Sequence, residues 1–381
     1  MPLQLSAAAV LSTLAFMPVA NPQWWLDDFG FEALPLDGSG VTIAVIDTGI
    51  DGQHPNLAGA VKAGTDYSGV GDQAGSPVGS SSFHGTAVAS IIAGRGAGPD
   101  DILGIAPGVS LLSASIGLGV AGADTDRQLA DAVVWAVDNG ADIINLSLTR
   151  NSAKWPVSWD EAFLYAFEND VLIVAATGNA EQGSFATAPA VIPGVIAVTA
   201  IDQAGSTEAD AGSEGIGVSV AAPGVEIMAS VPDSGTGVFS GSSVAAPIVS
   251  GLLALMIEAD PQASANDLIQ RLLESATDLG EPGFDASYGF GVINPKAAVE
   301  SRAVASVNPL GSLANWVRLY RPEVSEDAAE IVVPQQPLEA PRLVSEPPSQ
   351  AEQPINPLLY LLLVPIAFLP LLFVRKFFGR R

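Results

Sequence analysis

Four short apolar runs, separated by segments with helical patterns, constrain the fold of this chain more than any other feature. The first run covers residues 41–46, and similar runs cover 141–148, 171–176 and 195–200. Continuous apolar runs of this length suit parallel strands that are buried on both faces, because neither face then needs polar side chains. The sequence therefore predicts a buried, mainly parallel sheet.

Helical patterns occupy the intervals around these runs, at 85–93, 125–139, 158–169 and 243–258. Strands that alternate with helices predict an α/β fold of three layers, α/β/α, with right-handed crossovers. Functional sites of such sheets gather at the carboxyl ends of the strands. Asp47 directly follows the first run, so it is the first candidate for a functional residue.

The distribution of charge excludes one broad class of partner. No charged side chain precedes Asp27, and four of the 15 Lys and Arg residues lie in the last seven positions. Residues 27–374 carry 11 positive and 41 negative side chains, a formal charge of −30. A nucleic-acid partner would need a basic face, so none is expected. Cysteine is absent, which excludes disulfides and thiolate metal sites.

Both ends of the chain carry apolar segments outside the strand and helix pattern. Residues 3–19 have the length and small-residue exit of a secretory signal peptide, although the usual basic start is missing. The alternative is a buried helix of the globular part. Residues 357–374 form an unbroken apolar run of 18 residues, about the minimum that crosses a bilayer. The basic residues that follow, 375–381, predict a tail that stays in the cytoplasm.

Three short blocks offer the three groups that amide hydrolysis at neutral pH requires: a nucleophile, a base, and an acid that orients the base. They are Asp47-Thr48-Gly49, His84-Gly85-Thr86 and the segment 241–247, Gly-Ser-Ser-Val-Ala-Ala-Pro. Ser243 opens a helical pattern, where the helix dipole favours developing negative charge. The second histidine, His54, lies in a loop-like sequence and is interpreted as structural.

The order Asp, His, Ser resembles that of the subtilisin-like serine peptidases. The resemblance covers roughly residues 38–299. It implies that Ser243 is the nucleophile, that His84 is the general base and acid, and that Asp47 orients His84. It also implies that the side-chain amide of Asn179, in Ala-Thr-Gly-Asn at 176–179, stabilises the oxyanion.

The same resemblance implies a protein or peptide substrate bound in an extended form along strand-edge backbone. Ser147, Leu148 and Thr149 would line one wall of the cleft, and Thr177 and Gly178 would lie near the scissile bond. Thr149 stands where many relatives have Gly, and Thr177 stands where Ala or Ser is usual. Both changes are expected to narrow the pocket for the residue that precedes the scissile bond. Ser242 and Val244 depart mildly from the usual Thr and Met beside the nucleophile.

Two other features of the sequence concern an aspartic peptidase and a calcium site. An aspartic peptidase would need a second Asp-Thr/Ser-Gly triplet, and Asp233-Ser234-Gly235 supplies one, but no hydrophobic strand precedes it. Calcium sites of the family often use an Asp in the loop where Asn56 stands here. No clear cluster of oxygen ligands occurs, so no metal ligand is assigned, no cofactor is expected for catalysis, and structural calcium is left open.

Between the peptidase domain and the apolar run at 357–374, the chain is rich in Pro, Glu, Ser and Gln, a composition that favours an extended spacer. Its first part, around 316–320, is more apolar and is expected to pack on the domain or on a partner. The predicted organisation is a signal peptide (1–20), an N-terminal extension (21–37), a peptidase domain (38–300), a Pro-rich linker (301–356), a transmembrane helix (357–374) and a basic cytoplasmic tail (375–381).

This arrangement resembles the mycosins, membrane-anchored peptidases associated with type VII secretion. Two functions follow from it. The first is a peptidase that is tethered to the cell membrane by a single span, with its catalytic domain outside the cytoplasm. The second is a scaffold that supports membrane proteins of a secretion complex, with restricted or dispensable proteolysis. A generic anchored subtilisin-like peptidase fits the first function equally well.

Overall fold

The computed structural model describes residues 23–96, 102–150, 152–179, 185–207, 215 and 217–321. All of these lie in one compact unit, Met1–Glu323. The predicted signal peptide, transmembrane helix and basic tail lie outside the described residues, as does the predicted linker beyond Arg321.

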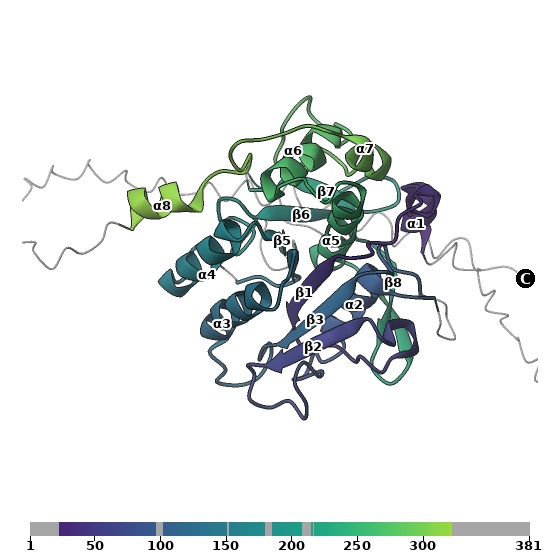
Figure 1. Ribbon diagram of the computed structural model, residues 1–381, viewed down its shortest axis with the longest axis vertical. Helices are drawn as coiled ribbons and strands as arrows, with labels where there is room; N and C mark the ends of the chain where they lie inside the picture. Colours follow the sequence, from purple (N-terminus) through teal and green to yellow (C-terminus); the bar gives the residue numbers. More distant parts are fainter. Residues whose placement is uncertain are drawn as a thin grey trace, which may run out of the picture. The chain divides into compact units, whose positions relative to one another are not determined.

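A parallel sheet of seven strands runs through the middle of the described residues, in the order β2-β3-β1-β4-β5-β6-β7 (Figure 1). The strands are β1 (Thr42–Asp47), β2 (Val61–Asp66), β3 (Ser110–Ser115), β4 (Ile143–Leu146), β5 (Leu172–Ala176), β6 (Ile196–Ile201) and β7 (Val220–Pro223). Strands that follow β1 in the chain lie on both sides of it in the sheet. The carboxyl end of β1 is therefore the point where the strand order reverses, which is where open α/β sheets form their sites.

Helices cover both faces of this sheet. The α-helices among the described residues are α1 (Trp24–Asp28), α2 (His84–Ala93), α3 (Thr125–Asp138), α4 (Val157–Glu168), α5 (Ser242–Ala259), α6 (Ala265–Ser275), α7 (Pro295–Glu300) and α8 (Leu313–Tyr320), and short 3-10 helices are η1 (Phe31–Ala33) and η2 (Pro55–Leu57). The helices α3 and α4 lie on one face, and α2 and α5 lie on the other (Figure 1). This arrangement confirms the predicted α/β fold in three layers.

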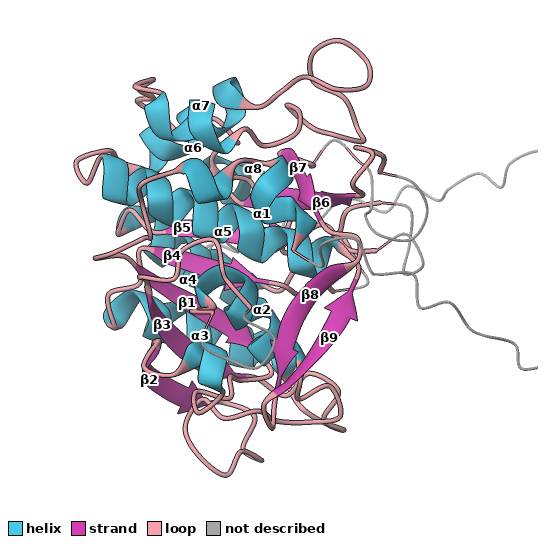
Figure 2. Cartoon of the chain, turned by 90° about the vertical axis from the view of Figure 1, so that its right-hand side faces the viewer, coloured by secondary structure: helices cyan, strands magenta, loops and turns pink. Residues whose placement is uncertain are grey.

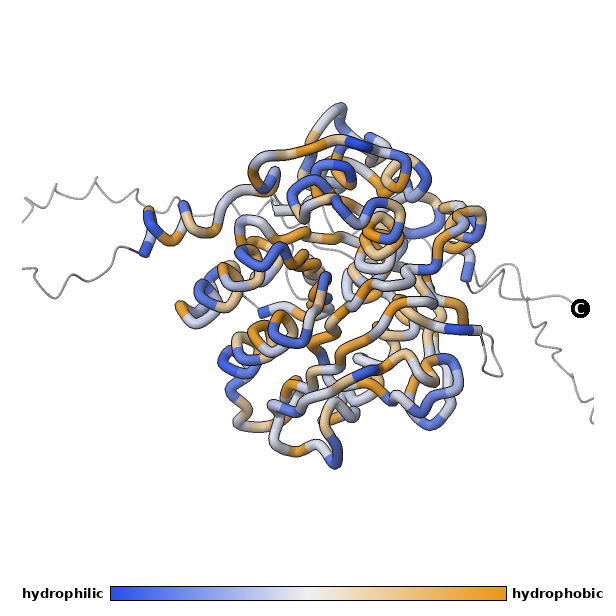
Figure 3. Tube along the Cα trace, in the orientation of Figure 1, coloured by the Kyte–Doolittle hydropathy of each residue, from blue (hydrophilic) through white to orange (hydrophobic). Residues whose placement is uncertain are grey.

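Alternating side chains of β1 show how one strand serves both layers. Ile43 and Val45 belong to the core with α2 and α5, whereas Ala44 and Ile46 belong to the core with α3 and α4. All four are completely buried. Figure 3 shows the same pattern, with hydrophobic residues along the central strands and hydrophilic stretches towards the periphery. A strand that is buried on both faces needs the continuous apolar run seen in the sequence.

One helix among the described residues, α5, is long and apolar enough to cross a membrane by length and composition. However, 78% of its apolar window is buried inside the domain. It packs on α2 and on the strands β4 to β7. These contacts are those of the core helix of a globular domain.

An antiparallel pair, β8 (Ile227–Val231) and β9 (Gly235–Phe239), stands beside the main sheet (Figure 2). Its second strand leads directly through Ser240 and Gly241 into α5. Gly241 has a φ of 137°, a conformation that favours glycine, so the chain can turn sharply before the helix begins. This hairpin was not predicted from the sequence.

The first part of the predicted linker, which starts at residue 301, falls within the described residues. The described residues of the linker, 301–321, are packed on the domain, and Leu313 of α8 is buried in the core with α3 and α4. Arg321 Nε lies 2.6 Å from Asp160 Oδ2, and Arg321 Nη2 donates to the Trp155 carbonyl at 2.8 Å. Because a buried carboxylate needs a partner, this ion pair holds the end of α8 on α4.

Candidate active site

Asp47 and His84 form the best-defined polar contact of the site. Asp47 is the last residue of β1 and is completely buried, and His84 is the first residue of α2. The Nδ1 of His84 lies 2.9 Å from both carboxylate oxygens of Asp47. A carboxylate only accepts hydrogen bonds, so Nδ1 carries the proton and Nε2 is left as the basic nitrogen.

Two opposing effects act on His84. Burial alone would lower the pKa of this imidazole, because a buried site disfavours the charged form. The charge of Asp47 and the hydrogen bond to it act in the opposite direction, and the net pKa of His84 is raised above its usual value of 6.5. The site therefore contains a histidine whose protonated form is stabilised by its carboxylate partner.

Thr48 fixes the position of this histidine. Its hydroxyl accepts a hydrogen bond from the backbone N–H of Gly85 at 3.1 Å and donates to the Ser81 carbonyl at 3.2 Å. The start of α2 is thereby attached to the turn that follows β1. This role of Thr48 was not predicted, although the threonine of the Asp-Thr-Gly block was the signal that could have indicated it.

Ser243 shares a cavity of about 450 Å³ with His84 and Asn179. It lies in the first turn of α5, where backbone N–H groups have no partners within the helix. Four of the predicted substrate-binding residues line the same cavity: Ser147, Leu148, Thr149 and Gly178. The cavity is placed at the carboxyl ends of β1, β4 and β5, where the parallel sheet predicts a site.

Thr177, the fifth predicted substrate-binding residue, is completely buried and is not part of the cavity lining. Its backbone N–H donates to the Val198 carbonyl at 3.1 Å, which continues the pairing of β5 with β6. The lining also contains Ser81, Leu118 and Ala176, which the sequence analysis did not single out.

Ser242 organises the loop that carries Asn179. The Ser242 hydroxyl accepts from the Gly178 N–H at 3.0 Å and lies 2.9 Å from the Gly178 carbonyl, to which it donates. The Ser242 N–H donates to Asn179 Oδ1 at 3.1 Å. A backbone N–H pairs with the oxygen of a side-chain amide and not with its NH2 group. This contact therefore fixes the orientation of the Asn179 amide and leaves its Nδ2 hydrogens for another acceptor.

His54 and Asp233 lie apart from this cavity. His54 is buried, its Nδ1 accepts from the Asn56 N–H at 3.2 Å, and its Nε2 lies 3.1 Å from the Gly235 carbonyl. Asp233 is exposed in the turn between β8 and β9, so a strand does precede it, contrary to the expectation from the sequence, and its N–H lies 3.3 Å from Asp51 Oδ2. An aspartic peptidase pairs two carboxylates that share one proton. Asp47 is paired with a histidine instead, so this geometry does not support that alternative.

No group of three or more His, Cys, Asp or Glu residues that could hold a metal ion occurs within the described parts of the chain. Asn56 is buried and donates from Nδ2 to the Ser230 hydroxyl at 3.1 Å. Its side chain therefore joins the loop after β1 to β8.

Comparison with known proteins places this geometry in a family. The profile of the subtilase family, peptidase S8, matches residues 38–291. The chain belongs to the subtilase family. Fervidolysin of Fervidobacterium pennivorans is 34% identical to this subtilase over 318 residues, which cover 74% of this chain and 44% of fervidolysin. Subtilisin Savinase of Lederbergia lenta is 34% identical over 263 residues, 69% of this chain and 92% of that protein.

Solved structures of subtilases agree with the fold. The crystal structure of fervidolysin, a keratinolytic enzyme related to subtilisin, matches with a TM-score of 0.65 and 31% identity. That match covers 74% of this subtilase and 46% of the fervidolysin chain. The structure of the MycP3 protease, from the type VII (ESX-3) secretion system, matches with a TM-score of 0.61 and 29% identity, over 74% of this subtilase and 88% of that chain.

Proposed function

We propose that this subtilase is a serine endopeptidase that hydrolyses peptide bonds with Ser243, His84, Asp47 and Asn179. The observation that carries the proposal is the contact between Asp47 and His84 at 2.9 Å, beside a cavity that also contains Ser243 and Asn179. The contact orients the basic Nε2 of the imidazole, and the shared cavity supplies a nucleophile and an oxyanion donor.

In this mechanism, His84 Nε2 takes the proton of the Ser243 hydroxyl as Ser243 Oγ attacks the peptide carbonyl carbon. The oxyanion that forms accepts hydrogen bonds from Asn179 Nδ2 and from backbone N–H groups at the start of α5. Protonated His84 then gives its proton to the leaving amine, and an acyl-enzyme remains on Ser243. A water molecule attacks this ester with His84 again as base, which releases the acid and regenerates Ser243.

A fluorophosphonate probe tests the proposal, because it labels only an activated serine. We expect labelling and peptide hydrolysis by the wild-type chain and the loss of both in Ser243→Ala. Ser240→Ala is the matched control, since Ser240 lies on the same segment but accepts a hydrogen bond from the Glu226 N–H outside the cavity. Labelling that persists in Ser243→Ala would disprove the assignment of the nucleophile.

We further propose that the domain works outside the cytoplasm, on a single membrane span formed by residues 357–374. The support is in the sequence: a signal-peptide pattern at 1–20, an apolar run of 18 residues, and four basic residues after it. The likeness to MycP3, a protease from a type VII secretion system, supports an association with secretion.

That likeness also supports a second candidate function, a scaffold that stabilises a secretion complex. Complementation of a deletion strain separates the two functions. If Ser243→Ala restores secretion, the scaffold function is favoured. If the variant assembles into an intact complex but secretion is lost, proteolysis is required.

A further inference from the structure

Both walls of the proposed substrate cleft are attached to the first turn of α3. On one side, the N–H of Gly117 donates to Gln128 Oε1 at 2.7 Å, next to the cavity residue Leu118. On the other side, Arg150 directly follows the cavity residue Thr149 and contacts Asp126. One helical turn therefore connects two segments that line the cavity, one that contains Leu118 and one that ends at Thr149, and these are the two cleft walls.

Arg150 is held in a fixed geometry. Its Nε and Nη2 donate to the two oxygens of Asp126 at 2.8 and 2.7 Å, a forked contact that sets both distance and angle. Its Nη1 donates to the Lys154 carbonyl, and its backbone N–H donates to the Ala188 carbonyl at 2.8 Å. These contacts determine the position of the residue at the end of the Ser147–Leu148–Thr149 wall.

Trp159 of α4 contacts both residues of this pair. Its indole N–H donates to the Asp126 carbonyl at 2.7 Å, and the Arg150 guanidinium lies 5.8 Å from the centre of its ring. The side chains of Arg150 and Asp126 are 33% and 32% exposed. A pair that is this exposed adds little to global stability, whereas its forked geometry can still fix the local backbone.

We infer that the pair Asp126–Arg150 is a positioning element that sets the separation of the two cleft walls for an extended peptide. The inference rests on the proposed peptidase function. An extended peptide contacts both walls along its length, so its binding depends on their separation. A small ester reaches only the catalytic end of the cavity. Loss of the pair should therefore weaken the binding of long substrates and leave the binding of short ones unchanged.

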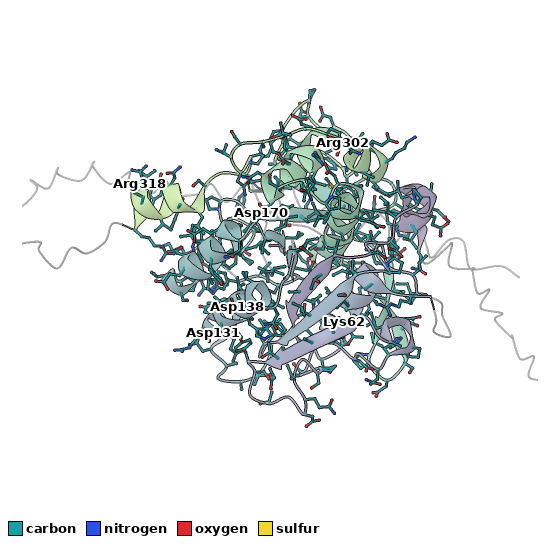
Figure 4. The ribbon with its side chains drawn as sticks, in the orientation of Figure 1. Lys62, Asp131, Asp138, Asp170, Arg302 and Arg318 are labelled. Carbon is teal, nitrogen blue, oxygen red and sulfur yellow. The ribbon has the colours of Figure 1, made fainter. Side chains whose placement is uncertain are left out.

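The test compares Arg150→Met and Asp126→Asn with the wild-type chain on two substrates: a peptide of about eight residues and an acylated amino-acid ester. We expect KM for the peptide to rise about tenfold, kcat to change less than about twofold, and ester hydrolysis to change less than about twofold. Arg127→Met is the matched control, because Arg127 lies on the same first turn of α3 as Asp126 but is 77% exposed and pairs with Asp131, one turn further along the helix. Asp131 lies on the outer side of α3 (Figure 4).

A binding measurement keeps this inference separate from the proposed function. In the Ser243→Ala background, a fluorescent peptide of about eight residues should bind about tenfold more weakly after Arg150→Met, whether or not the chain catalyses hydrolysis. Arg150→Lys keeps the positive charge but loses the forked contact, so its loss of peptide binding should be intermediate. This variant also provides a test if Arg150→Met does not fold. Equal losses on the peptide and the ester, or unchanged peptide binding, would overturn the inference. Absence of hydrolysis by the wild-type chain would overturn only the peptidase function.

Discussion

The Asp47 carboxylate determines both the tautomer and the proton affinity of His84. It accepts from Nδ1, and its charge opposes the effect of burial on the imidazole. A base must be neutral to accept a proton, so a raised pKa moves the onset of activity to higher pH. The single contact thus links the geometry of the site to its pH dependence.

We predict that kcat/KM of the wild-type chain rises with pH through a pKa above 6.5, the usual value for histidine. In Asp47→Asn the charge is lost while burial remains, so this limb should move to lower pH. The maximal kcat should also fall by about 10⁴-fold, because the asparagine favours the wrong tautomer. Profiles of kcat/KM against pH for both proteins provide the measurement.

The same contact affects stability, and the sign follows from linkage. A folded-state pKa above the unfolded value gives stability that is present below about pH 6.5 and is lost as pH rises through the folded pKa. Denaturant titrations across this window should show the loss in the wild-type chain and not in Asp47→Asn. If the wild-type chain lost this stability below pH 6.5, the result would contradict the raised pKa of His84.

The side-chain amide of Asn179 is the proposed oxyanion donor. Asn179→Asp keeps the Oδ1 that accepts from the Ser242 N–H at 3.1 Å but removes the Nδ2 donors. We expect kcat to fall by about 100- to 1000-fold, with KM nearly unchanged, because the lost donor acts on the transition state. Steady-state kinetics measures both constants. If Asn179→Asp kept full kcat, Asn179 would have no role as an oxyanion donor.

At the scale of elements, the start of α2 depends on a close approach to the turn after β1. A Cβ built on Gly85 would lie 2.3 Å from the Gly49 carbonyl oxygen, so no larger residue fits without moving one segment. Because His84 precedes Gly85, such a movement would also disturb its contact with Asp47. The glycine after His84 is thus required by packing.

We predict that Gly85→Ala destabilises the domain by about 2 kcal/mol, the cost of overpacking, and lowers kcat. The matched control is Gly52→Ala, because a Cβ at Gly52 would meet only the Val61 side chain, at 3.4 Å. Urea titrations and steady-state kinetics of both variants provide the comparison. Equal stability of Gly85→Ala and Gly52→Ala would show that the backbone contact does not constrain α2.

Elements differ in how well the sequence predicts them. The strands β1, β4, β5 and β6 lie in mainly apolar runs with at most one polar residue inside each strand's apolar stretch, and all four were predicted. The strand β3 was missed because Ser113 and Ser115 interrupt its apolar character. Their hydroxyls donate to the carbonyls of Gly75 and Ser76 at 2.7 Å, so a loop far along the chain makes these buried polar groups acceptable.

At the scale of the whole molecule, the proposed tether predicts where the chain is found. The full chain should remain with membranes after an alkaline wash, whereas a chain that ends at residue 356 should be soluble. The latter should keep its kcat/KM within about twofold, since the compact unit ends at Glu323. Fractionation followed by a peptidase assay measures both.

A chain that lacks only residues 375–381 is the control, because it keeps the apolar run and should stay with membranes. Recovery of the full chain in the soluble fraction would contradict the tether. An inactive chain that ends at residue 356 would instead show that the domain depends on residues beyond the spacer.

The fold class, the family and the candidate catalytic residues could be inferred from the amino-acid sequence alone. This was possible because strand periodicity and the three short blocks are local patterns, readable from neighbouring residues. Only the tertiary structure decided the role of Ser242, the burial of Thr177 and the pairing of Arg150 with Asp126. These features depend on contacts between residues that are distant in the chain, and such contacts form only when the sheet and its helices have packed.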